Sequence, residues 1–281
     1  MTQEILRDDL PGQGLDPEKM PGHWLLAQMG KRVLRPSGLE LTQKMLADLK
    51  IQADDAVVEF APGLGVTARL ALERQPASYI GIERNDVAAQ QVRRYLSALN
   101  RQCLVGVAEE TGLPDRSATV VYGEAMLTMQ TPDKKIQIVR EAARLLKPGG
   151  RYGIHELCLQ PDDLPDSKKE AISRALSETI RIGARPLTVA EWKTLLEAEG
   201  FTIASQVTAP MHLLEPKRLI QDEGFGGFLR FVWNVVRNPV ARRRILGMRA
   251  IFRSHAESLC AMTMVGVKQE TVAEPPVQNL R

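Results

Sequence analysis

The chain has 281 residues and a formal net charge of +3, with 44% hydrophobic and 25% charged residues. These values are ordinary for a globular protein and exclude a disordered or fibrous chain. No apolar run is long enough to span a membrane, and the N-terminus carries acids in place of the apolar core of a secretory signal. We therefore expect a cytoplasmic protein with no transmembrane segment.

The start of the chain, 1–22, is polar and rich in proline and glycine, so we expect a flexible arm there. Helical spacing of apolar residues predicts helices over 23–34 and 39–49. Short apolar runs then alternate with amphipathic segments, which predicts a parallel sheet covered by helices on both faces. The predicted strands lie at 55–60, 78–83, 103–107, 117–122, 151–158, 201–208 and 258–268, and the further helices at 66–74, 86–99, 133–147, 165–182 and 189–199.

The segment 57–70, VVEFAPGLGVTARL, predicts a buried strand ending in Glu59, a turn with Gly63 and Gly65, and the start of a helix. Glycine lets the backbone turn tightly and approach a ligand, and the helix start offers unpaired N–H groups. Glu83 ends the next predicted strand, about 20 residues on, the spacing at which an acid reaches ribose hydroxyls. The pair favours a nucleotide-type cofactor over an ordinary strand-to-helix turn. Ala68, at the third position of the dinucleotide fingerprint, leaves NAD open on spacing alone.

Residues 57–65 resemble the first motif of the class I S-adenosylmethionine (SAM) dependent methyltransferases, with Ala61 in place of that family's first glycine. The run Gly106-Val107-Ala108-Glu109 resembles the start of the family's third motif, although Val107 replaces its usual Asp. Glu109 or Glu110 is then the alternative contact for the adenine. The stretch 146–157, LKPGGRYGIHEL, resembles the turn and fifth strand of the same family. The motifs occur in the family's order, so the resemblance is specific over about 49–160.

The resemblance implies an α/β, Rossmann-like fold with a seven-stranded, mostly parallel sheet, an antiparallel last strand and N-terminal helices. It also implies SAM as the cofactor and S-adenosylhomocysteine as its product. Glu59 would anchor the turn and the methionine end, Glu83 would bind the ribose, and Arg84 would flank the adenine. The other implied cofactor contacts are Ala61, Gly63 and Gly65 in the turn, Ala108 and Glu109 at the adenine edge, and Gly123 and Glu124 after the fourth strand.

Two residues are candidates for catalysis. His155 is the first, because it ends the fifth predicted strand and imidazole titrates near neutral pH. A hydrogen-bonded structural histidine is an equally open interpretation of this residue. Glu124 is the second candidate. His23, His212 and His255 could also face the pocket, and many methyl transfers need no strong base.

The acceptor is expected to be a small molecule, with an apolar one as a candidate. The residues after the fourth strand, Tyr122-Gly123-Glu124-Ala125, lack the Asn/Asp-Pro-Pro-aromatic motif of enzymes that methylate amino groups of nucleic acids. We therefore expect no nucleic-acid partner. Two other functions stay open, an NAD-linked oxidoreductase and a SAM-binding protein that is not a catalyst.

A helical insert is predicted over 214–256, inside a methyltransferase domain formed by 23–213 and 257–269, with a flexible tail at 270–281. The insert carries two apolar stripes and, over 224–256, seven arginines with no Asp or Glu. Three interpretations are open for it: packing on the domain or on a second copy in a homodimer, a lid over the acceptor, or peripheral contact with an anionic membrane. The first stripe is Phe225, Leu229, Val232, Trp233 and Val236, and the second is Ile245, Met248 and Phe252.

The three cysteines are Cys103, Cys158 and Cys260. Their odd number and the absence of a C-x-x-C spacing argue against a disulfide framework and against a zinc site. We expect buried, free thiols and no bound metal.

Overall fold

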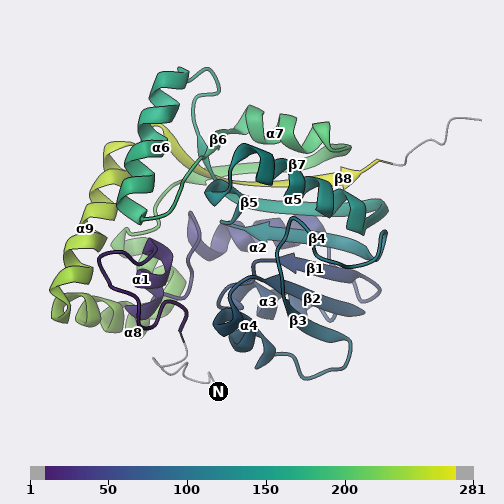
Figure 1. The fold of residues 1–281 in the computed structure, drawn as a ribbon, viewed down its shortest axis with the longest axis horizontal. Coiled ribbons are helices and arrows are strands. Elements are labelled where there is room, and N and C mark those ends of the chain that lie inside the picture. Colours follow the sequence, from purple (N-terminus) through teal and green to yellow (C-terminus); the bar gives the residue numbers. More distant parts are fainter. Residues whose placement is uncertain (1–9, 270–281) are drawn as a thin grey trace, which may run out of the picture.

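The structure is a computed structural model, and it describes residues 10–269. Its centre is a sheet with the order β3-β2-β1-β4-β5-β8-β7, and a short β6 pairs with β5 off this path (Figure 1). Strands β3 to β5 run parallel, whereas β8 runs antiparallel to β5 and β7. The predicted mixed sheet with an antiparallel last strand is confirmed. The strands are β1 Ala56–Phe60, β2 Ser78–Glu83, β3 Arg101–Val105, β4 Ala118–Glu124, β5 Leu146–Leu159, β6 Leu187–Thr188, β7 Phe201–Pro210 and β8 Leu259–Lys268.

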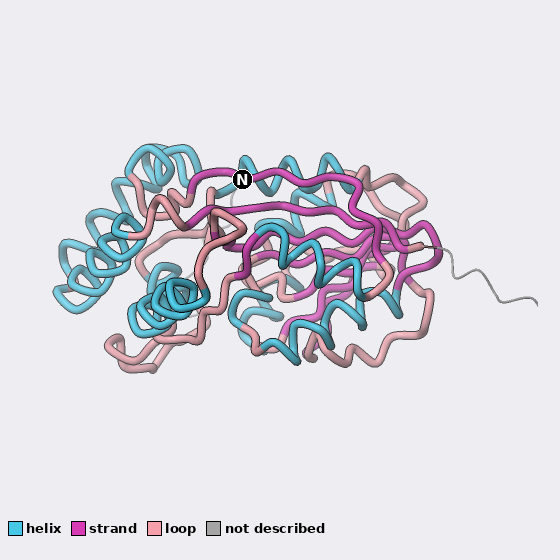
Figure 2. The backbone as a smooth tube through the Cα atoms, turned by 90° about the horizontal axis from the view of Figure 1, so that it is seen from above, coloured by secondary structure: helices cyan, strands magenta, loops and turns pink. Residues whose placement is uncertain are grey.

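Helices cover both faces of the sheet (Figure 2). Along β1, Val58 and Phe60 point into one core and Val57 into the other, as strand alternation requires. The first core is closed by α5 and α7, and the second by α2, α3 and α4. These helices are α2 Gly38–Leu49, α3 Val66–Leu72, α4 Asp86–Arg93, α5 Pro132–Leu145 and α7 Val189–Ala198, with a short 3-10 helix, η2, at Leu127–Met129.

A third apolar core lies beyond one end of the sheet and joins four helices, which we call the cap (left in Figure 1). Leu26 and Leu176 pack in this core with Met248 and Phe252. The predicted insert therefore shares its core with the N-terminal helix, although the two are far apart in the chain. The cap helices are α1 Gly22–Gln28, α6 Asp166–Ile180, α8 Pro216–Arg237 and α9 Pro239–Ser254.

The N-terminal segment packs on the domain over 10–22, so the expectation of a flexible arm is wrong there. Leu10 and Met20 are buried, because Leu10 packs with Ala27 and Leu64 and Met20 packs with the apolar side chains of the cap. Residues 1–9 and the predicted tail at 270–281 lie outside the described residues. The helix predicted over 23–34 ends at Gln28, since Gly30 has φ 105° and the chain continues as a loop to Gly38.

The two apolar stripes of the insert behave differently. Helix α8 bends at Gly224, whose φ of 72° and ψ of 167° are open essentially to glycine alone. Beyond the bend, Phe228, Phe231 and Val235 face the cap core, so the first predicted stripe, 225–236, is left exposed. The second stripe, on α9, is buried. Packing on the domain, the first of the three interpretations of the insert, therefore holds for α9 but not for the predicted stripe of α8.

Two of the three cysteines form a disulfide, which corrects the expectation of free thiols. Cys158 of β5 is bonded to Cys260 of β8, while Cys103 is a free, buried thiol. The antiparallel register of β5 and β8 places the two bonded residues opposite each other, although they are 102 residues apart in the chain. The spacing of the cysteines in the sequence does not reveal this register.

Candidate active site

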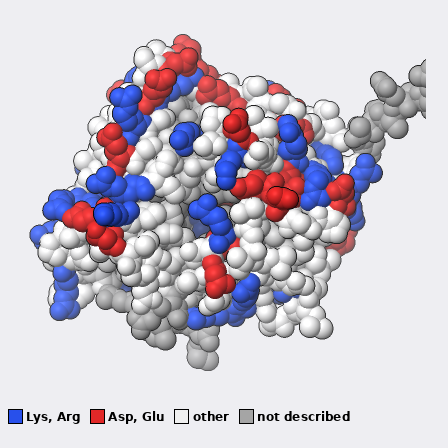
Figure 3. All heavy atoms as spheres, in the orientation of Figure 1, with Lys and Arg blue, Asp and Glu red and all other residues white. Residues whose placement is uncertain are grey.

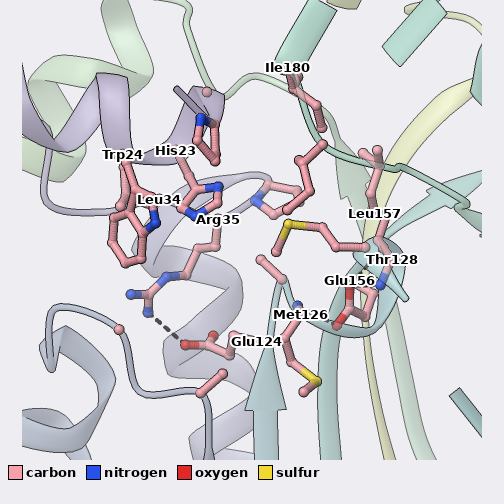
Figure 4. A pocket seen from close by; sticks show the side chains of 18 of the residues that line it. His23, Trp24, Leu34, Arg35, Glu124, Met126, Thr128, Glu156, Leu157 and Ile180 are labelled. Carbon is pink, nitrogen blue, oxygen red and sulfur yellow. Dashed lines mark hydrogen bonds and ion pairs between the residues drawn. The ribbon is translucent and has the colours of Figure 1, made fainter. Parts of the chain in front are cut away.

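A cavity of about 610 Å³ opens at the carboxyl ends of the parallel strands and continues beneath the cap (Figure 4). It lies where the strand order reverses between β1 and β4, the usual ligand position in such sheets. Of the ten cofactor residues predicted, eight line it: Glu59, Ala61, Gly63, Glu83, Arg84, Ala108, Glu109 and Glu124. Gly65 and Gly123 do not.

The glycine turn and Glu83 are joined directly. The N–H of Gly63 donates to Oε2 of Glu83 over 2.9 Å, and the N–H of Asn85 donates to the other oxygen. Ala61 holds a left-handed backbone, with φ 51°, at the place of the missing glycine. Burial raises the pKa of Glu83, although these backbone donors oppose the shift. The carboxylate therefore stands at the cavity wall with a fixed orientation.

The two glycines outside the cavity have structural roles. Gly65 precedes α3 with φ 72°, and a Cβ there would crowd the ring of Tyr95. Gly123 pairs in the sheet with Phe60 and Ile154. Neither backbone faces the cavity in the way the resemblance implied.

Glu59 is buried between two strands. Its Oε2 accepts hydrogen bonds from the hydroxyls of Tyr79, 2.6 Å away, and Tyr122, 2.8 Å away. Burial raises the pKa of Glu59 to about 7, because the two neutral hydroxyls offset only part of the cost of removing its charge from water. Glu59 thus ties β1 to β2 and β4 beneath the turn.

The adenine side of the expected site lacks the family's acid but has another one nearby. Val107 and Glu109 both line the cavity, whereas Glu110 does not. The carboxylate of Glu109 accepts a hydrogen bond from the ammonium of Lys134 over 2.7 Å. Of the two alternatives that the sequence left open, the structure therefore places Glu109 at the cavity.

Glu124 is the centre of a buried polar cluster. Its Oε2 pairs with the guanidinium of Arg35 at 2.6 Å, and its Oε1 accepts from the hydroxyl of Thr42 and lies 2.8 Å from Nδ1 of His155. The hydroxyl of Thr67 also donates to it. Burial alone would raise the pKa of Glu124, but Arg35 and His155 outweigh it and lower the pKa to about 2. The group is a carboxylate at any ordinary pH.

His155 lies behind Glu124 and does not line the cavity. The ring is completely buried, and Nε2 donates to the carbonyl of Pro36 over 2.8 Å while Nδ1 faces Glu124. His212 and His255 are also absent from the lining. His23 does line the cavity, and burial, followed by the charge of Arg84, lowers its pKa to about 4.

Arg35 is the site residue that motif reasoning missed. It belongs to the loop between α1 and α2, and Figure 4 shows it pointing at Glu124, which is 89 positions further along the chain. Glu156, the residue after His155, lines the cavity and has a structural role. Its carboxylate accepts from the N–H groups of Met126, Leu127 and Thr128 and so orders the loop after β4. Arg35 could not be found from the sequence, because a basic residue in an irregular loop belongs to no periodic pattern and to no motif of fixed spacing.

The part of the cavity beneath the cap is apolar. Helices α1, α6 and α9 contribute to its wall, and Figure 4 shows Leu157 and Ile180 on this side. Within the described residues no group of three or more His, Cys, Asp and Glu is arranged to hold a metal. The apolar lining comprises Leu26, Leu176, Ile180, Met211, Leu213, Met248 and Phe252.

The sequence matches known proteins over most of its length. Residues 57–150 match a family described as a methyltransferase domain. The chain is 32% identical over 221 residues to an uncharacterized protein of Haemophilus influenzae, covering 77% of this chain and 86% of that one. It is 26% identical over 155 residues to sterol 24-C-methyltransferase erg6 of Aspergillus fumigatus, covering 52% of this chain and 40% of that one.

Solved structures show the same fold. Phosphoethanolamine N-methyltransferase 2 of Haemonchus contortus, in complex with S-adenosyl-L-methionine, has a TM-score of 0.67 at 14% identity, covering 96% of this chain and 61% of that chain. The MccD protein has a TM-score of 0.66 at 17% identity, covering 84% of this chain and 99% of that one. The methyltransferase domain matched over 57–150 supports the class I SAM-dependent methyltransferase superfamily for this chain, and the solved structures show the fold that it shares with such enzymes.

Proposed function

We propose that this SAM-dependent methyltransferase acts on a small, apolar acceptor. The observation that carries the proposal is the division of one cavity into a carboxylate-lined half and an apolar half. We call them the donor half and the cap half. An apolar wall favours a ligand with little charge, because burying such a surface against a polar ligand would leave that ligand's polar groups unpaired. A nucleic acid would need a basic surface in its place.

The donor half fits SAM. Glu83 has free acceptor capacity for ribose hydroxyls beside the N–H of Gly63, and Glu109 with the backbone of Ala108 stands where an adenine edge would lie. Glu124 offers a permanent negative charge, which favours a cationic group at close range. When bound, SAM supplies an electrophilic methyl group on its sulfonium.

The roles of the two predicted catalytic residues follow from the geometry. Glu124 is too acidic to act as a general base near neutral pH, so we assign it to binding of the donor's positive charge. We assign His155 to positioning Glu124, since both of its ring nitrogens are engaged away from the cavity. His23 faces the cavity and is neutral at pH 7, but a pKa of about 4 makes it a weak base, so we assign it to contact with the acceptor.

Calorimetry with SAM, S-adenosylhomocysteine and NAD tests the donor. We expect both SAM and its product to bind and NAD not to. Glu83→Gln should weaken SAM binding about tenfold, because a charge-assisted hydrogen bond contributes about 1.5 kcal/mol or more. Glu73→Gln, an exposed site on the same domain, should leave the affinity unchanged. Tight NAD binding without SAM binding would overturn the assignment and favour an oxidoreductase.

Labelled SAM tests the acceptor. The protein is incubated with methyl-labelled SAM and an extract of the source organism, and the products are divided between organic solvent and water. We expect label in the organic phase and its loss in His23→Ala with SAM affinity retained. Label only in the aqueous phase would refute an apolar acceptor. SAM binding with no labelled product at all would favour a SAM-binding protein that is not a catalyst.

A further inference from the structure

The exposed stripe on α8 takes no part in the lining of the cavity. After the bend at Gly224, Phe225 is 64% exposed and Trp233 is 60% exposed. Leu229, Val232 and Val236 share this face, because residues three and four apart stand on one side of a helix. Contiguous apolar surface of this kind on a folded protein marks an interaction site.

The segment that carries the stripe is basic, although acids elsewhere in the chain pair with some of its arginines: Glu18 with Arg243, and Glu215 with Arg249 and Arg253. The segment 224–256 contains seven arginines and no Asp or Glu. The guanidinium of Arg237 lies 5.1 Å from the ring centre of Trp233, at the border of the stripe, and Arg242 is exposed at the start of α9. Figure 3 shows basic side chains, with some acidic ones among them, at the left end of the molecule, where Figure 1 places α9.

We propose that this stripe docks the protein on an anionic lipid bilayer. A helix with an aromatic apolar face bordered by arginines lies in the interface between headgroups and acyl chains, where it gains from burial and from attraction to anionic lipids. Trp suits that depth, since its ring is amphipathic. Within the part of the chain that the structure describes, no helix has the length and apolarity to cross the bilayer, so the contact is peripheral.

A second copy of the chain is the less suitable occupant. A two-fold contact would place the stripe of one copy, with the arginines at its border, against the same stripe of the other. The segment 224–256 itself has no acid that could face Arg237 across that contact. Like charges brought together at an interface cost affinity, whereas anionic headgroups would complement them.

The docking helix is also fastened to the active site. Just before the bend, Glu223 accepts from the N–H groups of Arg32, at 2.8 Å, and Val33, at 2.9 Å. Asp222 accepts from the N–H of Leu39 over 3.0 Å, and the buried ammonium of Lys31 lies between the two acids. A Cβ at position 38 would overlap the Asp222 carboxylate, so Gly38 permits this contact.

The loop held in this way carries Arg35, the partner of Glu124 in the cavity. The stripe, the loop and the apolar wall formed by α9 are therefore parts of one packed unit. Resting on the proposed function, the inference gives the acceptor a source, because an apolar acceptor partitions into a bilayer and the cap would bring the cavity to it.

Vesicle co-sedimentation of the full chain tests the proposal. We expect binding to vesicles of phosphatidylcholine mixed with phosphatidylglycerol, weaker binding to phosphatidylcholine alone, and release by high salt. The double variant Phe225→Ser, Trp233→Ser should bind the mixed vesicles at least about tenfold more weakly, because two half-exposed aromatic rings no longer enter the interface. Leu99→Ser removes a fully exposed apolar side chain elsewhere and should bind like the wild type.

Arginine variants separate charge from burial. Arg237→Gln with Arg242→Gln should weaken binding to mixed vesicles about 30-fold, at about 1 kcal/mol for each charge. Arg140→Gln, an exposed arginine on α5, is the matched control. Equal binding to neutral and mixed vesicles, or no loss in the double variants, would overturn the proposal.

Light scattering measures the oligomeric state and so tests whether a second copy of the chain covers the stripe. A wild-type dimer that becomes a monomer in the Phe225, Trp233 double variant, with no vesicle binding, would show that a second copy covers the stripe and would refute docking on lipid. These assays need no cofactor, so their outcome is independent of the calorimetry with SAM. The stripe variants should keep wild-type SAM affinity, since neither residue lines the cavity.

Discussion

The donor half of the cavity presents buried carboxylates at the ends of neighbouring strands, whereas the cap half presents aliphatic, aromatic and thioether side chains from helices distant in the chain. Each carboxylate depends on a specific partner, since an unpaired buried charge is costly. The cap residues depend on shape and volume, because removing one leaves a cavity. The comparison teaches that one pocket can fail in two ways, by loss of a partner or by loss of packing.

Two acids within the donor half show how strongly the pKa of a carboxyl group depends on its hydrogen-bond and ion-pair partners. Glu59 has only tyrosine hydroxyls and its pKa rises to about 7, whereas Glu124 has Arg35 and His155 and its pKa falls to about 2. Glu59 is buried, and the side chain of Glu124 is only 7% exposed. Burial raises the pKa of both acids, so the guanidinium of Arg35 and the contact with His155 make the difference.

The largest effect is expected for Arg35→Leu, which removes the partner of a buried carboxylate. We expect the free energy of unfolding at pH 7 to fall by about 4 kcal/mol, measured by urea denaturation, because Glu124 would remain charged and buried. The matched control is Arg140→Leu, whose ion pair with Glu199 is exposed and should hardly matter. An equal, small effect of both variants would contradict the idea that charge pairing organises the donor half.

The second-largest effect is expected in the pH dependence of stability that Glu59 causes. Its folded pKa of about 7 lies above the ordinary 4.5, so its contribution to stability is fully present below pH 4.5 and is lost as the pH rises through 7. Between about pH 5 and pH 8 the wild type should lose about 3 kcal/mol relative to Glu59→Gln. Urea titrations at several pH values measure the difference.

Parallel curves for the wild type and Glu59→Gln would show that Glu59 is not held protonated by burial. Glu73→Gln serves as the control, since Glu73 is exposed and its variant should follow the wild type at every pH.

Met248→Ala tests the cap half. Met248 is almost fully buried against α1 and α6, so we expect a loss of about 2 kcal/mol in the free energy of unfolding. SAM affinity by calorimetry should stay at the wild-type value, because the donor half keeps all its partners. A fall in SAM affinity as large as that of Glu83→Gln would mean that the two halves are not separable.

The smallest effect is expected at Ala61, whose left-handed backbone suits glycine better. Ala61→Gly should raise the free energy of unfolding by about 0.5 kcal/mol, after the gain in unfolded-chain entropy is counted. Ala171→Gly, at an exposed position inside α6, should lower it by about 1 kcal/mol. Thermal denaturation measures both changes in stability. A loss of stability in both variants would argue against backbone strain at the turn.

The sequence predicted the sheet and the donor half because both depend on short-range pattern. Strands and helices follow from apolar periodicity, and Glu59, Gly63 and Glu83 belong to a motif whose spacing is fixed by one strand-turn-helix unit and the strand beside it. All three line the cavity.

Tertiary structure alone decided the rest. Arg35 meets Glu124, Cys158 meets Cys260 and Leu26 meets Met248 across separations that no local pattern records. Amphipathic spacing shows that a helix has an apolar face, but it does not show what covers that face. Which stripe of the insert is buried therefore depended on which face of α8 packs on the cap core. The sequence thus determined the cofactor motif and the sheet that carries it, whereas the pairing of distant side chains decided the state of each acid and the surface left exposed.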